Sequence, residues 1–181
     1  LKVLDTVNVP TVGGGMTAVP VKEIREKAFS SAKKMTQLTI GKNVEIIGKK
    51  ACEKCTKLTK VIGGVAVKEI RDGAFASCTE LETLPSFDKL VKVGEKAFYK
   101  VKELTKFTFG KFVSKIGAKA FYACESLKTL KFKGTCELSV GSKAFDKIHS
   151  DAKATIKKAV KKEYTKELKK GKLKKSQIKA K

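Results

Sequence analysis

The chain has 181 residues, of which 41% are hydrophobic, a fraction close to that of ordinary folded proteins and too high for a wholly disordered chain. Its formal net charge is +23, and among its Lys and Arg residues only Arg25 and Arg71 are Arg. Because Lys is a hydrated point charge whereas Arg reads bases bidentately, sequence-specific nucleic-acid binding is disfavoured, while loose attraction to polyanions stays open.

No run of about 18 apolar residues occurs, so the sequence predicts no membrane span. The first residue is Leu, and the opening residues do not have the pattern of a signal peptide, which leads us to expect an excised piece of a longer chain. The length and source of that longer chain stay open.

The first predicted strand lies near the N-terminus, where Leu4, Val7 and Val9 before Pro10 match the pattern L-x-x-L-x-I-P. Residues 11–18, TVGGGMTA, then form an insertion that three consecutive glycines are expected to make flexible. The GGG run has neither the G-x-G-x-x-G pattern nor a following G-K-[ST], so it does not predict a phosphate site. Residues 1–23 are therefore expected to be a partial repeat with a Gly-rich insertion.

Six units with a period of 23 residues follow, and one step of the period is 24 residues. A unit has an Ala-Phe pair, an Ile or Val five residues before the Phe site, and apolar residues six and nine positions after it; Cys52 replaces Phe in the second unit, and the sixth unit has Asp151 at the first of the later positions. The Ala stands at Ala28, Ala51, Ala74, Ala97, Ala120 and Ala144, and we number the units one to six by it. The next residue is Phe29, Cys52, Phe75, Phe98, Phe121 and Phe145. Such a period predicts a solenoid, because each unit buries its apolar edge only against its neighbours.

The fourth unit illustrates the predicted elements. Residues 103–109, ELTKFTF, alternate apolar and polar side chains and predict a short strand. Residues 94–104 have a helical or turn-like spacing of apolar residues and predict one or two helical turns, after a tight bend at Gly94. The strand residues nine positions after the Phe site are expected to stack in one buried ladder on parallel strands: Leu38, Val61, Leu84, Phe107 and Leu130.

Residues 116–132, IGAKAFYACESLKTLKF, show the full motif I-G-x-x-A-F-x-x-C-x-x-L-x-x-L-x-F. This motif closely resembles the BspA-like class of leucine-rich repeats, and the resemblance covers about residues 1–156. It implies a leucine-rich-repeat solenoid with a concave parallel sheet of short strands and with helical turns on the convex side. It further implies an extracellular or cell-surface protein of a host-associated microbe, used for adhesion to a host or microbial surface protein or glycan.

Residues 157–181 are expected to form a Lys-rich cap over the last unit. Residues 159–171 predict a helix with Val160, Tyr164 and Leu168 on one face and with Gly171 as its stop, and the final residues predict an edge strand. The segment has two competing roles, closing the core or binding polyanion through its outward lysines. The polyanion candidates are Lys158, Lys162, Lys166 and Lys169.

The cysteine pattern CEKC at residues 52–55 has three interpretations: core packing, a disulfide or redox pair, and half of a zinc site. Core packing is favoured, because Cys55 fills a position taken by Cys78, Cys124, Ala32, Val101 and Ile148 in the other units. No second pair supplies the four ligands of zinc, so we expect neither a metal nor a cofactor. Cys136 lies outside the register and is the thiol expected to be exposed. His149, beside Ser150 and Asp151, is expected to be a polar residue in a turn, because neighbours in sequence do not make a triad.

The remaining candidate site is the outer face of the predicted concave sheet, where the side chains between the core positions point outward. One column is Gln37, Lys60, Thr83, Lys106, Thr129 and Lys153, and the second is Thr39, Ile62, Pro85, Thr108, Lys131 and Thr155. Phe87, just past the third strand, is expected to be an exposed aromatic anchor. This face is either a binding surface or an ordinary solvated side of a repeat protein.

Two function hypotheses follow, and an enzyme is a distant third because no catalytic constellation is visible. The first is a non-catalytic binding or adhesion module that engages a protein or another macromolecule through the concave sheet. The second is a structural spacer whose Lys-rich end binds anionic cell-wall polymer or another polyanion. Salt separates them, because loose attraction between lysines and a polyanion fades steeply with ionic strength.

Overall fold

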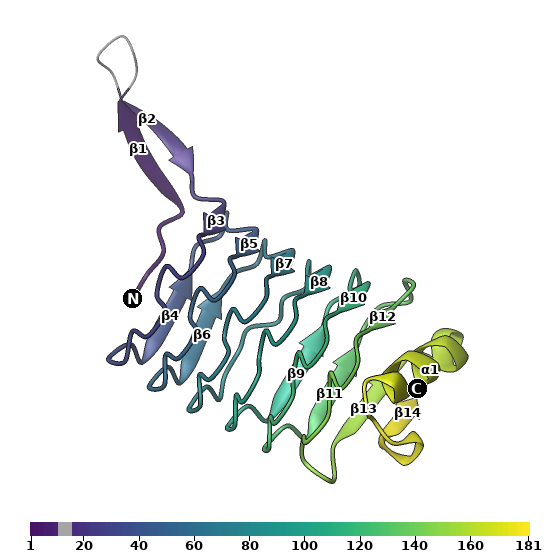
Figure 1. Ribbon diagram of the computed structural model, residues 1–181. Helices are drawn as coiled ribbons and strands as arrows, with labels where there is room; N and C mark the ends of the chain where they lie inside the picture. The colour runs from purple at the N-terminus through teal and green to yellow at the C-terminus, as the bar shows by residue number, and fades with distance from the viewer. Residues whose placement is uncertain (11–15) are drawn as a thin grey trace.

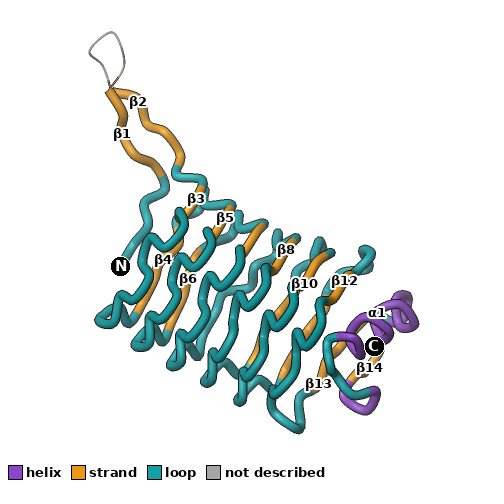
Figure 2. The backbone as a smooth tube through the Cα atoms, in the orientation of Figure 1, coloured by secondary structure: helices purple, strands orange, loops and turns teal. Residues whose placement is uncertain are grey.

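The computed structural model describes residues 1–10 and 16–181 and shows a solenoid (Figure 1). Successive units wind as coils stacked side by side, from a hairpin at the N-terminal end to a helix at the C-terminal end (Figure 1). Strands and turns alternate around the coils (Figure 2), and helices within the described residues occur only between Lys158 and Gln177. The predicted repeat solenoid with a C-terminal helix is therefore confirmed.

The coils carry two rows of parallel strands, and the first row is divided into two hydrogen-bonded sheets by the third unit. We call the first the long-strand sheet: β4 (Gln37–Ile40), β6 (Lys60–Gly63), β9 (Lys106–Phe109), β11 (Thr129–Phe132) and β13 (Lys153–Ile156). We call the second the short-strand sheet: β3 (Glu23–Ile24), β5 (Ile46–Ile47), β7 (Glu69–Ile70), β8 (Lys92–Val93), β10 (Lys115–Ile116) and β12 (Ser139–Val140). Hydrogen-bonded neighbours come from successive units in both sheets, so residues at the same position of the period stack on one another.

The inward side chains of both sheets meet in one continuous core. Its centre is a stack of four phenylalanine rings from consecutive units, with centroid distances of 5.4, 5.0 and 5.6 Å: Phe75, Phe98, Phe121 and Phe145. In the predicted strand ladder, Leu38, Val61, Phe107 and Leu130 are buried, whereas Leu84 is only partly buried.

The third unit interrupts the long-strand sheet. It has no regular strand, and only isolated parallel bridges connect Thr83 to Lys60 and Phe87 to Phe109. Pro85 lies between the two bridges and has no N–H to donate to a ladder, which explains why the strand stops after Thr83. The expectation of one uninterrupted ladder through Leu84 is therefore wrong.

Phe87 is completely buried, so the expectation that it is an exposed anchor is also wrong. Its bridge to Phe109 places it at the inner strand position that Ile40 occupies in the first unit. The second unit has Gly63 at that register position, paired with Ile40, and therefore lacks a large side chain there. The Phe87 ring packs against the next residue, Gly64, where an added Cβ would be 3.2 Å from its Cε1 atom.

The segments around the Ala-Phe pairs are chains of tight turns and not the predicted helical turns. Two positions of each unit have left-handed or glycine-like backbone at φ of 53–62°: Lys27, Lys50, Gly73, Lys96, Lys119 and Lys143, and four residues later Ser31, Lys54, Ser77, Lys100, Ala123 and Lys147. A left-handed residue turns its neighbouring peptides in a direction that an α-helix does not allow.

This backbone directs alternate N–H groups into the next coil. In the second unit, the N–H groups of Lys50, Cys52 and Lys54 donate to carbonyl groups of the third unit at 2.9, 2.7 and 2.8 Å. The N–H groups of Ala51 and Glu53 donate within their own coil instead. The turn segments therefore form a third hydrogen-bonded ladder along the solenoid. A helical turn would remove this ladder, because its N–H groups would donate to carbonyl groups of the same turn.

The glycines after the Ile or Val site have a different role from the predicted bend. Gly48, Gly94, Gly117 and Gly141 do not have a positive φ. A Cβ on any of them would overlap the backbone of the preceding coil, for example at Arg25 for Gly48. These positions require Gly because two backbones come close together there.

The N-terminal segment forms a hairpin of β1 (Thr6–Pro10) and β2 (Met16–Pro20), which pair antiparallel and project from the end of the solenoid (Figure 1). We had expected the strand around Val7 to belong to an incomplete first coil. Instead, Lys2 forms the parallel bridge to Thr39, and Val3 donates its N–H to the Thr39 carbonyl at 2.8 Å. The predicted flexible glycines at 13–15 lie outside the described residues.

The C-terminal segment covers the last unit with a 3-10 turn η1 (Lys158–Val160), helix α1 (Lys161–Lys170), a second 3-10 turn η2 (Lys175–Gln177) and strand β14 (Ile178–Ala180). The predicted apolar face is confirmed, because Tyr164 and Leu168 are buried and Val160 is partly buried. The predicted edge strand is also present, since β14 pairs in parallel with β13.

Helix α1 ends as predicted at Gly171, but the left-handed residue is Lys172 at φ 80°. The N–H groups of Lys172 and Leu173 bond back to Lys169 and Leu168, which is a Schellman motif. Gly171 is small for another reason: a Cβ there would be 2.8 Å from Cγ1 of Val140.

The cap replaces the hydrogen bonds that a seventh unit would make. Phe121 donates its N–H to Ala144 in the next unit, whereas Phe145 in the last unit donates to the Gly171 carbonyl at 2.8 Å. The Val140 N–H donates to the Glu167 carboxylate at 2.8 Å, and the Tyr164 hydroxyl donates to the Cys136 carbonyl at 2.9 Å. The cap therefore both covers the core and pairs exposed backbone groups of the last coil.

Truncation of Phe98 tests the stacking of the core. Because its ring is packed between those of Phe75 and Phe121, Phe98→Ala is expected to lower the free energy of unfolding by about 3–5 kcal/mol. Phe29→Ala is the control, since Phe29 stands at the same position in the first unit and is only half-buried. Urea melts of both variants give the comparison, and equal losses would contradict stacking between neighbouring units.

Glu167 tests the role of the cap. Glu167→Ala leaves the Val140 N–H without its acceptor and is expected to cost about 1–3 kcal/mol of unfolding free energy. Glu163→Ala removes an exposed carboxylate from the same helix and is expected to change stability by less than about 0.5 kcal/mol. If the two variants unfold at the same denaturant concentration, the Glu167 carboxylate does not stabilise the chain by accepting the Val140 N–H in place of a carbonyl of a further coil.

Candidate binding surfaces

The long-strand sheet brings both predicted columns together on its outer face. Strand register places Gln37 beside Lys60, and it places Lys106, Thr129 and Lys153 side by side. The exposed members are Gln37, Lys60, Thr83, Lys106, Thr129, Lys131 and Lys153, and the half-buried members are Thr39, Ile62, Pro85, Thr108 and Thr155. Phe87 is the one predicted residue that is not on this surface. No outward strand position of this face carries a carboxylate, so the face is positively charged.

A second group of lysines lies where the long strands end, and we call it the strand-end lysine cluster: Lys111, Lys131, Lys133, Lys157 and Lys181. These residues line a hollow of about 410 Å³ together with Phe132, Thr155 and Ile156. Lys133, Lys157 and Lys181 directly follow β11, β13 and β14, which are adjacent parallel strands. One carboxylate contacts the cluster, that of Asp88 at 2.8 Å from Lys133 Nζ.

The repeat pattern did not predict this cluster, apart from Lys131, although a signal was present. Three of the lysines recur at 24-residue steps immediately after a predicted strand, and parallel strands end at the same edge of a sheet. It also missed Phe112, which follows β9 and has 55% of its surface exposed. Phe112 is the exposed aromatic residue in the repeats, which Phe87 was expected to be.

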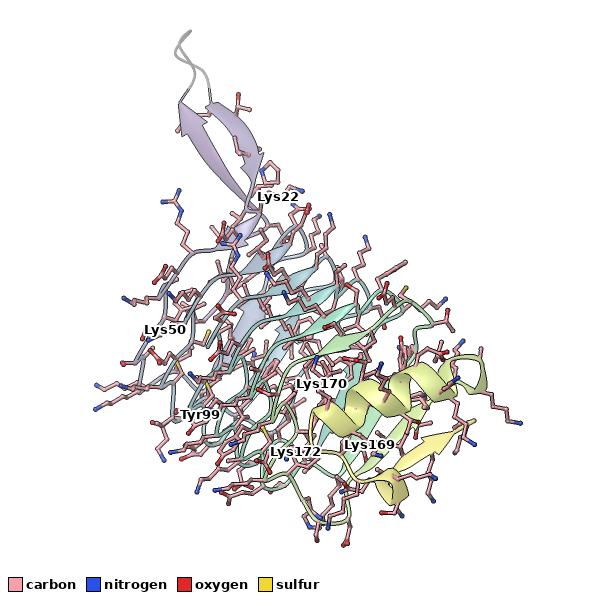
Figure 3. The ribbon with its side chains drawn as sticks, turned by 45° about the vertical axis from the view of Figure 1, so that its right-hand side comes forward. Lys22, Lys50, Tyr99, Lys169, Lys170 and Lys172 are labelled. Atoms are coloured by element: carbon pink, nitrogen blue, oxygen red, sulfur yellow. The ribbon has the colours of Figure 1, made fainter. Side chains whose placement is uncertain are left out.

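The predicted polyanion lysines of the cap do not form a single patch. Lys158, Lys162, Lys166 and Lys169 are all exposed. Lys158 and Lys162 border a groove with Lys175 and Ile178, whereas Lys166 borders a different groove beside Tyr164. Lys169 lies with Lys170 and Lys172 around the C-terminal end of α1 (Figure 3).

Carboxylates concentrate instead beside the short-strand sheet, where they join neighbouring units. Glu45 accepts hydrogen bonds from Lys22 at 2.8 Å and from Lys68 at 2.7 Å, one in the coil before and one in the coil after. These two ammonium groups lower the pKa of Glu45 to about 2. Arg71 similarly contacts Glu23 at 2.9 Å and Glu69 at 3.4 Å. The acidic residues of these units therefore neutralise lysines on this side and leave the long-strand face positive.

A family assignment is now possible. A model of the BspA type leucine-rich repeat region matches residues 22–152 with six copies. The chain belongs to the BspA type leucine-rich repeat family. The six copies agree with the six units found in the sequence and with the coils of the solenoid. Among curated protein sequences, none matches this chain significantly.

Solved structures of other repeat proteins have the same fold. A leucine-rich repeat protein of T. pallidum is 20% identical, with a TM-score of 0.60 over 83% of this chain and 84% of that one. A leucine-rich cell surface protein of Faecalibacterium prausnitzii is 23% identical, with a TM-score of 0.63 over 83% of this chain and 48% of that one. The pneumococcal vaccine antigen PcpA is 16% identical, with a TM-score of 0.57 over 94% of this chain and 45% of that one. The chain thus spans about half the length of the last two.

The cysteines of this leucine-rich-repeat chain lie mostly in its core. Cys55, Cys78 and Cys124 are buried at one repeat position, and their thiols donate to carbonyl groups of the preceding coil at 2.9, 2.9 and 3.1 Å. Complete burial raises the pKa of the Cys124 thiol, and hydrogen bonding to Cys55 together with burial raises that of Cys78. Cys55 differs, because hydrogen bonds from Cys52 and Cys78 lower the pKa of its thiol to about 3. The neutral buried thiols of Cys78 and Cys124 favour the packing interpretation of this position.

The other chemical candidates find no support in the described part of the chain. None of its His, Cys, Asp and Glu side chains form a group of three that could hold a metal ion. His149 Nδ1 accepts the Asp151 backbone N–H at 3.1 Å, while the exposed Asp151 carboxylate is 4.0 Å away, too far for a triad hydrogen bond. None of the helices in residues 1–10 and 16–181 is both long enough and apolar enough to cross a membrane.

Thiol titration tests the assignment of the cysteines. In the native protein one thiol, Cys136, is expected to react with an alkylating reagent, because it is the exposed cysteine of the five. In denaturant without a reducing agent, all five are expected to react. Mass spectrometry gives the count, and Cys136→Ser is expected to abolish the native reaction. Three or fewer modified cysteines in the unfolded chain would require a disulfide.

Proposed function

We propose that this chain is a non-catalytic binding module of a secreted or cell-surface protein, and that it engages a protein or another macromolecule through the outer face of the long-strand sheet. The observation that carries the proposal is the pattern of that face. Its inward positions are filled by the core, while its outward positions are exposed Lys, Thr and Gln in register. Regular solenoid faces offer extended surfaces of this kind for macromolecular partners.

The similar structures support this proposal at the level of their own descriptions. One is a leucine-rich cell surface protein, and another is a pneumococcal vaccine antigen. The contact surface proposed here is centred on Lys60, Lys106, Lys131 and Lys153, with Phe112 at its border. Because outward lysines dominate, the partner is expected to present acidic groups, and an exposed aromatic side chain is a typical anchor of an interface.

The second candidate is a spacer whose Lys-rich end binds an anionic polymer. The strand-end lysine cluster favours it, because five lysines with one paired carboxylate border a single hollow. The helix lysines Lys158, Lys162, Lys166 and Lys169 could extend this attraction over the cap. Such a contact would be electrostatic and sequence-independent, in contrast to a contoured protein interface.

An array of surface proteins and glycans, probed at about 0.1 M and about 0.5 M salt, tests both candidates. The Debye length is about 10 Å at the lower concentration and shorter at the higher one, so loose electrostatic attraction weakens across this range. Three variants are compared. The sheet variant combines Lys60→Gln, Lys106→Gln and Lys153→Gln, and the strand-end variant combines Lys133→Gln, Lys157→Gln and Lys181→Gln. The helix variant changes Lys158, Lys162, Lys166 and Lys169 to Gln. All three are expected to melt like the parent, because the mutated side chains are on the surface.

The main proposal expects binding that persists at the higher salt and weakens at least about tenfold in the sheet variant only. Retention on heparin that disappears at the higher salt and depends on the strand-end or helix variant would favour the spacer. Binding that persists in the sheet variant at both salts would overturn the long-strand face as the contact surface.

A further inference from the structure

A tyrosine stack on the turn segments ends at an open hollow. The residue after the core Phe site is, from the first unit to the sixth, Ser30, Glu53, Ala76, Tyr99, Tyr122 and Asp146. The rings of Tyr99 and Tyr122 stack with their centroids 5.4 Å apart and their planes within 10°. Because the units follow one another in order, the face of Tyr99 away from Tyr122 is turned towards the third unit. There the column has only Ala76.

The third unit also lacks the side chain of the neighbouring column. Gly73 stands at the left-handed position where every other unit has Lys. The result is a cavity of about 430 Å³, bordered by Lys50 and Glu53 of the second unit and by Lys96 and Tyr99 of the fourth. Figure 3 shows Lys50 and Tyr99 along the same edge of the solenoid.

The fold does not require these two small residues. Lys adopts the Gly73 backbone conformation in the other five units. A Cβ on Gly73 would meet only the flexible Lys50 side chain at 3.3 Å and the Ala76 Cβ at 3.9 Å. The fourth and fifth units carry Tyr where the third has Ala76. The hollow is therefore a feature of this unit and not a consequence of close packing.

The polar groups around the hollow are balanced in charge, unlike the rest of the chain. Three carboxylates and three ammonium groups border it: Glu53, Asp72, Glu95, Lys49, Lys50 and Lys96. Lys50 is 3.5 Å from Glu53, and Lys96 is 3.0 Å from Glu95. The Lys100 ammonium lies over the Tyr99 ring, 5.4 Å from its centre, so a ligand that stacks on this ring would displace the flexible Lys100 side chain. Such a balance does not select a polyanion, but it offers both donors and acceptors beside an aromatic face.

We propose that this hollow binds a neutral saccharide, with one pyranose ring stacked on Tyr99 in the place that a third tyrosine would take. The negative face of the Tyr99 ring attracts the C–H groups of a sugar. Sugar hydroxyls both donate and accept hydrogen bonds, and they would pair with the Glu53 carboxylate and with the Lys50 and Lys96 ammonium groups. The volume lies in the range of small-ligand pockets. This site is separate from the long-strand face and does not rest on the function proposed above.

Filling the hollow with the residue that the next two units use tests the proposal. Ala76→Tyr should extend the stack and keep the fold, whereas Tyr99→Ala removes the platform. Asp146→Tyr is the matched control, because it adds a ring to the same column beyond Tyr122 and leaves the hollow open. An array of neutral and acidic saccharides identifies ligands, and tyrosine fluorescence measures their affinity. The chain has no Trp and three Tyr, two of which are in the stack.

We expect a neutral saccharide to bind the parent chain with a Kd in the millimolar range or below, independently of salt. Affinity should fall at least about tenfold in Ala76→Tyr and Tyr99→Ala and stay unchanged in Asp146→Tyr. Absence of any neutral saccharide binding up to about 10 mM overturns the proposal, and so does equal binding by Ala76→Tyr. Binding that is lost in the sheet lysine variant instead would place the saccharide on the long-strand face and would also overturn this site.

Discussion

The backbone hydrogen bonds between successive coils are the constraint on which the rest of this solenoid depends. They run along the long strands, the short strands and the turn segments, and they hold neighbouring coils at about the spacing of strands in a sheet, 4.7–4.9 Å. At this spacing the backbone at Gly48 and its equivalents excludes any side chain. The turn segments must also adopt left-handed conformations at eleven non-glycine positions, a cost of about 1–2 kcal/mol each that the ladder between coils offsets.

The same constraint determines what the two ends and the two sheets can do. A coil without a following coil has N–H groups that need acceptors, so α1 supplies the Gly171 carbonyl and the Glu167 carboxylate. Side chains at one position of the period lie close enough to form charge pairs between coils. On the short-strand side the pairs have opposite sign, as around Glu45, and they link the coils. On the long-strand side the charges have one sign, which leaves that face available for an acidic partner.

The period alone predicted the stacking order, the ladder of core residues and the apolar face of the cap, because each depends only on which residues recur in phase. It could not predict the turn segments. Apolar residues at helical spacing are compatible with both a helical turn and a chain of turns, and the choice depends on N–H groups that bond to another coil. It also misplaced Phe87, because the burial of this ring depends on its contact with Gly64 of the preceding unit, which the period does not reveal. The candidate surface was predicted wherever strands are regular, and the lysines beyond the strand ends were missed because they lie outside the strand pattern.

Small residues that replace larger ones in the repeat are therefore of two kinds. In the first kind a neighbouring side chain fills the space that the small residue leaves, and in the second kind the space stays open. Gly63 has no side chain at a strand position where the first unit has the buried Ile40, and the buried Phe87 ring of the next unit packs against the adjacent Gly64, which keeps the core filled there. Gly73 stands where the other units have Lys, Ala76 stands where the next two units have Tyr, and a hollow remains beside them. Beside this hollow, the Tyr99 ring is covered by the flexible Lys100 side chain and not by a third tyrosine ring. Since the backbone of the third unit would accept the larger residues, the open position is better explained by a ligand than by the fold.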